Sequence, residues 1–255
     1  MRSDDKETLR QYFLGLEDGH IYFFYRPRYT EVHEVADIDH LSIVLHPFDS
    51  KLYRLISLDS ATLPPEAQNF NMIVGHIDKV DDKQSVILHE LDQKRELVLG
   101  VPHIKQAASR PCGEGVYTIL SINNQSHLIY SLELPRLDGK LNKSLRINTE
   151  GNLRIGIFNP LFEAQEDTLK NLPVIDESLK AKIGSSHIVY NEITTLLNIV
   201  HLKIALFKDF ISLAKDLQRQ LHPLKDTEKT ADIFTDLKLQ KERFPVSPLL
   251  EGNWK

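Results

Sequence analysis

The sequence predicts an α+β fold, in which a C-terminal helical segment packs on a sheet of duplicated antiparallel β-units. A strand, a polar turn and a second strand that opens with His-Leu and ends at Pro occur twice, at residues 19–47 and 115–135. Another β-like run follows each copy, at residues 51–58 and 152–158. Between positions 191 and 221, apolar residues instead recur at steps of three and four, which is the helical period.

Most elements before residue 160 are expected to be strands. Residues 5–16 predict a short helix that ends near Gly15. Residues 105–115 are expected to connect the two units, and the short strands with intervening turns favour antiparallel pairing. We therefore expect a β-rich region over residues 1–160, with units at about 17–104 and 113–160, forming one continuous sheet or two stacked sheets. The expected strands are 20–26, 40–46, 51–58, 70–77, 85–89, 96–101, 116–122, 127–134 and 152–158.

The last part of the chain, residues 161–255, is expected to be a helical segment and an extended arm on the same core. Residues 161–184 are polar and predict loop with a short helix. The amphipathic segment 191–221 allows two interpretations. Its periodicity favours one continuous helix, whereas its β-branched residues favour a strand over 199–206 followed by a helix over 208–221. The tail contains the only tryptophan, Trp254, and is expected to pack as an arm.

The composition limits the classes of function. A net charge of −5 argues against a general nucleic-acid or anionic-membrane binder, although a local basic patch stays open. Cys112 is the only cysteine, so no disulfide forms within one chain. The polar N-terminus and the lack of an apolar run of about 20 residues predict no membrane association. We expect a cytoplasmic protein.

Several stretches of the chain carry a resemblance. Together they are similar to an uncharacterised family of bacterial proteins, and the similarity covers most of the chain. The resemblance implies one ordered architecture and supplies no catalytic residues. The stretches are Gly19-His-Ile-Tyr-Phe-Phe-Tyr-Arg-Pro27, Gly113-Glu-Gly-Val-Tyr117, His127-Leu-Ile-Tyr-Ser-Leu-Glu-Leu-Pro135, Ile157-Phe-Asn-Pro160, Thr230-Ala-Asp-Ile-Phe234 and Gly252-Asn-Trp254.

The first candidate site is the aromatic and basic stretch 22–29. On a strand, Tyr22 faces one side and Tyr25 the other, while Arg26 and Arg28 lie at the strand end. Two guanidinium groups beside aromatic rings could bind a phosphate, a carboxylate or a stacked base. The alternative is that the aromatic residues are core and the arginines pair with the acidic run over residues 31–39, and this alternative is favoured.

Histidines and Cys112 give weaker candidates. His40 and His127 open the second strand of each unit and could complete a site with the arginines. The His33–His40 stretch holds imidazole and carboxylate groups, but their spacing matches no metal motif, so we expect no metal. Cys112 lies in an expected loop near Arg110 and is interpreted as incidental rather than nucleophilic. No phosphate-loop, nucleophile-elbow or dinucleotide motif is present, and we expect no cofactor.

These observations favour a non-catalytic binding or protein-interaction module, with a protein or an anionic small molecule as its partner. One alternative is an enzyme that acts on an anionic small molecule at a dispersed site of Arg26, Arg28 and either His40 or His127. Another alternative is a local binder of single-stranded nucleic acid. If part of segment 191–221 projects from the core, it predicts a homodimer.

Overall fold

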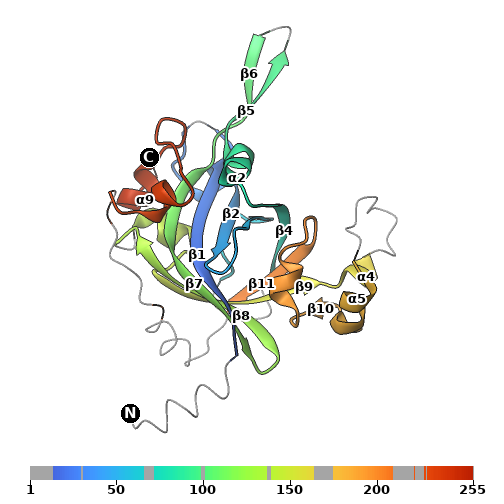
Figure 1. The fold of residues 1–255 in the computed structure, drawn as a ribbon. Coiled ribbons are helices and arrows are strands. Elements are labelled where there is room, and N and C mark those ends of the chain that lie inside the picture. The colour runs from blue at the N-terminus through green and yellow to red at the C-terminus, as the bar shows by residue number, and fades with distance from the viewer. Residues whose placement is uncertain are drawn as a thin grey trace, which may run out of the picture.

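The computed structural model describes residues 14–29, 31–65, 72–98, 101–136, 139–163, 175–208, 221, 227 and 229–254. Within these residues, eight strands form a closed antiparallel β-barrel (Figure 1). The expected α+β sheet with a packed helical segment is therefore wrong, because the protein is mostly strand and its sheet closes on itself. The barrel strands are β1 (Leu14–Pro27), β2 (Ile38–Pro47), β3 (Tyr53–Leu58), β4 (Met72–Asp81), β7 (Arg110–Ile122), β8 (Gln125–Leu134), β9 (Glu150–Phe158) and β11 (Lys203–Lys208).

The barrel is built from two three-stranded meanders. Strands β1, β2 and β3 form one, and β7, β8 and β9 form the other. The two meanders meet through antiparallel pairing of β1 with β7, which runs from Leu14↔Ser121 to Tyr25↔Arg110. Strand β4 extends the first meander, and β11 joins β4 to β9 and closes the ring. The two similar sequence units therefore lie side by side in one barrel.

Side chains alternate between the inside and the outside of the barrel, as the period of a strand requires. On β1, Ile21, Phe23 and Tyr25 belong to the interior cluster, whereas Tyr22 and Phe24 belong to a second cluster on the outer face. This confirms the alternation expected for the aromatic stretch. Large side chains fill the interior, so the barrel is a packed core rather than a channel.

Both ends of the barrel are covered by short helical segments. At the end where β1 begins, Leu196 and Leu197 of the α6 segment pack against the interior cluster. At the opposite end, Leu141 and Leu145 of α3 do the same, and Trp254 is partly buried near Tyr25. The helices are η1 (Val35–Asp37), α2 (Gln84–Leu91), α3 (Lys140–Leu145), α4 (Pro160–Glu163), α5 (Glu177–Ile183), α6 (Ile193–Leu196), α8 (Asp232–Thr235) and α9 (Ser247–Glu251).

Residues 85–89 were expected as a strand, but they form helix α2, and this prediction is wrong. The physical reason is the spacing of Ile87, Leu88 and Leu91, which places three buried side chains on one helical face. This face packs on the outside of β3 and β4. Residues 105–115 were also expected as a connection, yet β7 already begins at Arg110.

A continuous helix over 191–221 is wrong for the described part of that segment. Residues 203–208 form strand β11, with Ile204 and Leu206 inside the barrel. Pairing with β4 and β9 on both sides favours a strand here over the helical period. The expected helix over 208–221 lies outside the described residues except for positions 208 and 221, and most of the expected helix over 5–16 lies outside them too. Leu14 to Leu16 belong to β1.

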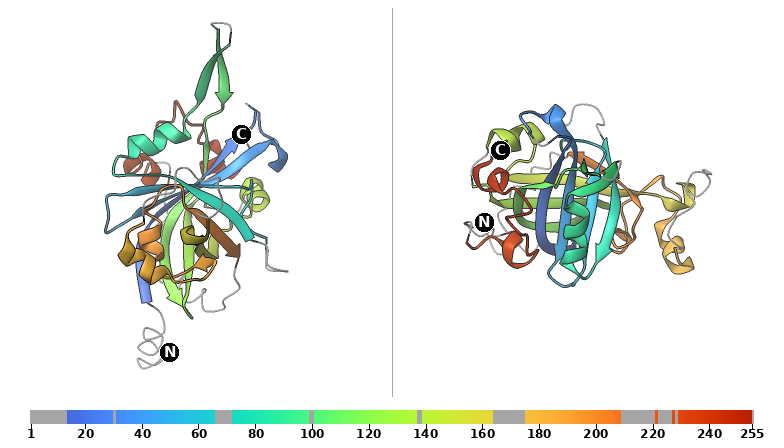
Figure 2. Two further views of the ribbon diagram at one scale, coloured as in Figure 1. Left: turned by 90° about the vertical axis from the view of Figure 1, so that its right-hand side faces the viewer. Right: turned by 90° about the horizontal axis from the view of Figure 1, so that it is seen from above.

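Two further pieces of sheet complete the fold. Strands β5 (Lys94–Val98) and β6 (Val101–Gln106) form a two-stranded hairpin that stands clear of the barrel in Figures 1 and 2. The short strand β10 (Ile188–Val189) pairs with the end of β9.

None of the helices in the described residues has the length and apolar composition needed to cross a membrane.

Candidate functional site

The hairpin joins the barrel beside the end of β1, and a hollow of about 440 Å³ lies at this junction. We call it the cationic hollow, because arginine and lysine side chains dominate its lining. Its residues come from the β1 end, from the start of β2 and from the bases of β5 and β6. They are Arg26, Pro27, Arg28, Tyr29, Asp39, Lys94, Lys105 and Gln106.

Arg26 is a fixed part of this hollow. Its side chain is buried, and its guanidinium donates hydrogen bonds to the carbonyl oxygens of Glu90 (2.7 Å), Asp92 (3.3 Å) and Ala107 (2.6 Å). Two of these carbonyls lie at the C-terminal end of α2, where helical carbonyls lack partners within the helix. Burial lowers the pKa of Arg26 below its ordinary value. Arg26 therefore holds α2 and the hairpin base against the barrel.

Arg28 faces the solvent more than Arg26 does, with 49% of its side chain exposed. Its Nε donates to the carbonyl oxygen of Ile38 at 3.0 Å, and its Nη1 lies 3.3 Å from Asp39. His40 lies on the other side of Asp39, with 3.0 Å between Nδ1 and Oδ2. These contacts position the Arg28 guanidinium at the mouth of the hollow.

The hairpin contributes the remaining cations. Lys94 begins β5 and lies 2.9 Å from Glu90, and Lys105 belongs to β6 near its end. Across the hollow, Tyr29 is 66% exposed. Tyr29 ends the candidate stretch 22–29, but the sequence prediction gave it no role and missed both lysines. The signal available was Gly100 between two β-prone runs, which would have predicted a hairpin that brings residues 94 and 105 together.

The other predicted site residues lie elsewhere. Tyr25 points into the barrel, and burial raises its pKa to about 12, although Arg110 opposes this shift. His127 is buried, with Nδ1 3.3 Å from Asn152 Oδ1. It pairs with Leu120, whereas Tyr25 pairs with Arg110, so His127 lies about 33 Å along β7 from the hollow. The structure brings together Arg26, Arg28 and His40, and it separates them from His127.

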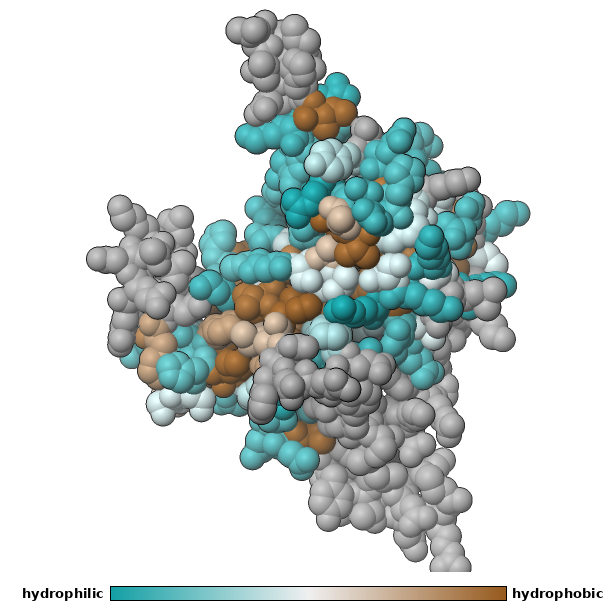
Figure 3. Space-filling model, turned by 180° about the vertical axis from the view of Figure 1, so that it is seen from behind, coloured by the Kyte–Doolittle hydropathy of each residue, from teal (hydrophilic) through white to brown (hydrophobic). Residues whose placement is uncertain are grey.

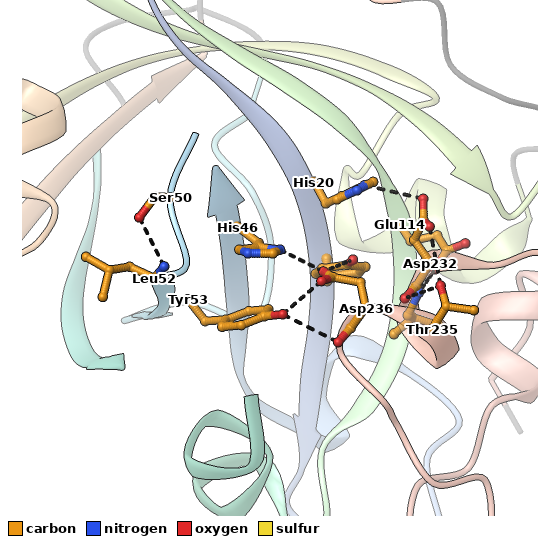
Figure 4. A network of polar contacts seen from close by, with 11 residues as sticks. His20, His46, Ser50, Leu52, Tyr53, Glu114, Asp232, Thr235 and Asp236 are labelled. Carbon is orange, nitrogen blue, oxygen red and sulfur yellow. Dashed lines mark hydrogen bonds and ion pairs between the residues drawn. The ribbon is translucent and has the colours of Figure 1, made fainter. Parts of the chain in front are cut away.

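Tyr22 belongs to a second polar cluster, where the C-terminal arm crosses the outer face of the barrel (Figure 4). Its hydroxyl donates to Asp236 at 2.7 Å. His46 Nδ1 lies 2.9 Å from the same carboxylate, and the Tyr53 hydroxyl donates to it at 2.8 Å. His20 lies 3.3 Å from Asp232 nearby. We call Tyr22, His46, Tyr53 and Asp236 the arm clamp.

The pKa shifts in the arm clamp favour anchoring over proton transfer. Burial alone would raise the pKa of Asp236, but the hydrogen bonds from His46, Tyr22 and Tyr53 outweigh it and lower the pKa. Burial and the neighbouring Asp236 carboxylate raise the pKa of both Tyr22 and Tyr53. The carboxylate therefore stays an acceptor and the phenols stay donors near neutral pH, which suits a fixed contact.

A third group of polar side chains lies on the outside of β2, β3 and β4. Burial raises the pKa of Asp78, which accepts a hydrogen bond from Ser57. The Ser42 and Ser57 hydroxyls lie 3.4 Å apart, and His76 lies 3.2 Å from Asp59. Within the described residues no hydrogen bond joins either of these serines to a histidine, so the group lacks the nucleophile–base contact of a hydrolase.

Neither metal binding nor thiol chemistry gains support. Among the described residues, no group of three or more His, Cys, Asp or Glu side chains is arranged to hold a metal. Asp37 instead accepts hydrogen bonds from the backbone N–H groups of His33 and Glu34, which lower its pKa. Cys112 is buried in β7 rather than lying in a loop, and burial raises the pKa of its thiol.

Comparison with known proteins gives no relative from which a function could be transferred. No protein-family model matches this chain, and no curated protein and no solved structure is significantly similar to it.

Proposed function

We propose that this protein is a non-catalytic binding module that takes a small anionic ligand in the cationic hollow. The observation that carries the proposal is the charge of the lining, to which the described residues contribute four cationic side chains and one carboxylate. The chain as a whole has a net charge of −5. Concentrating cations in one concave place on an acidic protein attracts anions to that place.

The hollow is also held in shape before any ligand binds. Arg26 is fixed by three backbone carbonyls, and Arg28 is fixed by Ile38 and Asp39. Within the described residues, no partner is assigned to Nη2 of Arg28, which leaves its two N–H groups for a ligand. A guanidinium held in one orientation loses less entropy when it binds a phosphate or a carboxylate.

The dispersed enzyme with His127 receives less support than the binding module, because His127 is far from the arginines. With His40 in its place the enzyme stays a second candidate, since His40 lies 3.0 Å from Asp39, which lines the hollow. The binder of single-stranded nucleic acid also receives less support. Stacking bases need exposed aromatic rings, but Tyr22, Phe23, Phe24 and Tyr25 are all buried. Only Tyr29 in that stretch offers an exposed ring.

A protein partner receives little support from the described surface. Its large exposed apolar side chains are on separate segments, at Tyr29, Phe48, Met72 and Ile104. The face in Figure 3 is largely hydrophilic, with hydrophobic surface gathered near its middle. Nothing in the part of the chain that the structure describes indicates what would cover that surface. The cytoplasmic location and the homodimer stay predictions from the sequence.

The test is isothermal titration calorimetry with inorganic phosphate, pyrophosphate, citrate and AMP. The informative variant is Arg28→Ala with Lys105→Ala, which removes two cations and leaves Arg26 in place. The matched control is Lys51→Ala with Lys229→Ala, which removes the same charge from two exposed positions outside the hollow. Thermal unfolding of all three proteins checks that each is folded.

At least one of the four anions should bind the native protein at a single site. The hollow variant should bind it at least about tenfold more weakly, since each charge-assisted hydrogen bond contributes about 1.5–3 kcal/mol. The control variant should bind it as the native protein does. Equal affinity in both variants, or no binding of any of the four anions, would show that the hollow is not the site.

A further inference from the structure

A second hollow of about 480 Å³ is lined by residues of the β7–β8 turn and of the β10 segment. These elements lie at the end of the barrel opposite to the cationic hollow, far from the β5–β6 hairpin (Figure 1). The pairing Leu14↔Ser121 marks this end of the sheet, whereas Tyr25↔Arg110 marks the other. We call it the polar hollow. Its lining residues are Leu16, Ser121, Asn124, Ser126, Ile183, Ser186, Ile188, Val189, Tyr190, Asn191 and Glu192.

One wall of the polar hollow is the turn that joins β7 to β8. Asn123 and Asn124 have φ values of 50° and 61°, which are typical of the two-residue turn that closes a twisted hairpin. The Ser126 hydroxyl, at the start of β8, donates a 2.6 Å hydrogen bond to the carbonyl oxygen of Tyr190. This bond ties the turn to the opposite wall, so both walls are fixed relative to each other.

The Tyr190 ring is held against strand β9. A Cβ atom added at Gly156 would lie 2.9 Å from Cε1 of Tyr190, which is too close for two carbon atoms. The missing side chain at Gly156 therefore leaves room for the edge of the Tyr190 ring close to the β9 backbone. Tyr190 and the aliphatic residues Leu16, Ile183, Ile188 and Val189 are the lining residues that offer apolar atoms to the polar hollow.

The polar groups of this hollow are almost all uncharged. Within the described residues, no hydrogen-bond partner is assigned to the side chains of Ser121, Asn124 and Ser186 or to the Tyr190 hydroxyl. Among the described residues that line it there is no lysine or arginine, and the one carboxylate, Glu192, lies 3.5 Å from Lys182. Hydroxyl and amide groups both donate and accept hydrogen bonds, so they match a ligand that also does both.

We propose that the polar hollow binds a neutral saccharide. A sugar ring offers hydroxyl groups around its edge, which can exchange hydrogen bonds with Ser121, Asn124 and Ser186. Its C–H face can pack on Tyr190 and the aliphatic residues. The absence of a cation among the described lining residues disfavours a phosphate or a carboxylate, and the Glu192–Lys182 pair disfavours an amine. The volume lies within the usual range for small-ligand sites.

The experiment is saturation-transfer difference NMR followed by calorimetry. The probes are D-glucose, D-galactose, D-mannose, L-rhamnose and N-acetyl-D-glucosamine, each as the free sugar and as its methyl glycoside. The test variants are Ser121→Ala with Ser186→Ala, and separately Tyr190→Ala. The matched control is Ser85→Ala with Ser144→Ala, which removes one exposed and one half-buried hydroxyl outside the hollow.

The native protein should bind at least one sugar, with signal transferred to the ring C–H protons. The serine variant should bind that sugar about tenfold more weakly, because two hydrogen bonds are lost. This variant removes no hydrogen bond that the structure records, so it should keep its thermal stability and remain interpretable even if Tyr190→Ala unfolds. The Ser85/Ser144 control and the Arg28/Lys105 variant should bind the sugar normally. Binding of no sugar in the panel, or equal binding by the serine variant and its control, would overturn the proposal.

Discussion

Arg54 and Glu17 meet inside the barrel as a two-pronged ion pair, with Nη1 2.6 Å from Oε1 and Nη2 2.8 Å from Oε2. Their side chains are only 3% and 11% exposed. The Tyr117 hydroxyl also donates to Glu17 at 2.6 Å, and Nε of Arg54 donates to Asn198 at 2.8 Å. The pair therefore joins β1, β3 and β7 to the segment that follows α6 and covers this end of the barrel.

Removing one partner of this pair should be strongly destabilising. Arg54→Met leaves the Glu17 carboxylate with no cation, and we expect a loss of about 3–5 kcal/mol in the free energy of unfolding. Urea denaturation of the native protein and the variant measures this loss in the free energy of unfolding. The double variant Arg54→Met with Glu17→Met should lose less than the sum of the two single variants, since no charge is left unpaired. A single variant within about 1 kcal/mol of the native protein would contradict this interpretation.

The arm clamp should also contribute to stability. Asp236→Asn places an amide where Tyr22, His46 and Tyr53 contact a carboxylate, and we expect a cost of about 2–3 kcal/mol. Asp59→Asn is the matched control, because Asp59 pairs with one histidine at an exposed position and should cost less than about 1 kcal/mol. Equal costs for the two variants in urea denaturation would count against a special role for the clamp.

The same carboxylate should give the protein part of its acid sensitivity. The pKa of Asp236 is lowered in the folded state, whereas an unfolded aspartate has a pKa of about 3.9. Its stabilisation is therefore complete above about pH 4 and is lost as the pH falls through the folded-state pKa. Urea midpoints measured between about pH 6 and pH 2 should fall more steeply for the native protein than for Asp236→Asn. If the urea midpoints of the two proteins fell equally with pH, Asp236 would not be a source of the acid sensitivity.

The Cys112 thiol should not react with thiol reagents in the folded protein. Its side chain is fully buried, its Sγ lies 3.5 Å from the Phe23 carbonyl oxygen, and burial raises the pKa of the thiol. Because the thiolate is the reactive form, a thiol reagent such as iodoacetamide should label Cys112 only after unfolding. Mass spectrometry before and after urea treatment measures the labelling. Rapid labelling of the folded protein would show that the Cys112 side chain in β7 is accessible to the reagent and not fully buried.

Gly115 should tolerate no side chain. A Cβ atom there would overlap the carbonyl oxygen of Ser131, at the point where the pairing of β7 with β8 shifts register. We expect Gly115→Ala to cost about 3 kcal/mol, because two backbones would have to separate. Gly15→Ala is the control, since its added Cβ would meet only Leu120 Cδ2 at an ordinary 3.9 Å. In thermal unfolding, the melting temperature of Gly115→Ala should be clearly lower than that of Gly15→Ala. Similar melting temperatures for the two variants would contradict the overlap at Gly115.

Sequence patterns predicted local elements better than their assembly. The alternation of Tyr22, Phe23, Phe24 and Tyr25 correctly assigned each ring to one face of β1, because a two-residue period depends only on the strand itself. The strand over 203–208 was ambiguous, since its apolar spacing also fits a helix. Its pairing with β4 and β9, which decided the outcome, involves residues distant in the sequence.

For the candidate site too, the sequence predicted residues close together in the chain but not the contacts between distant segments. Arg26 and Arg28 were identified from their spacing around Pro27, and both line the cationic hollow. Their different roles could not be predicted, because the carbonyls that bind Arg26 come from α2 and from the chain before β7, more than sixty residues away. Lys94 and Lys105 belong to a hairpin whose place beside β1 depends on these same contacts.

The position of β11 has a consequence for how the chain is made. Seven of the barrel strands in the described residues precede β11 in the sequence, yet β4 and β9 have no direct pairing with each other and both need β11. During synthesis, the ring therefore cannot close until residues 203–208 have left the ribosome. Until then, the nascent chain presents two open strand edges, which are the kind of surface that chaperones shield from aggregation.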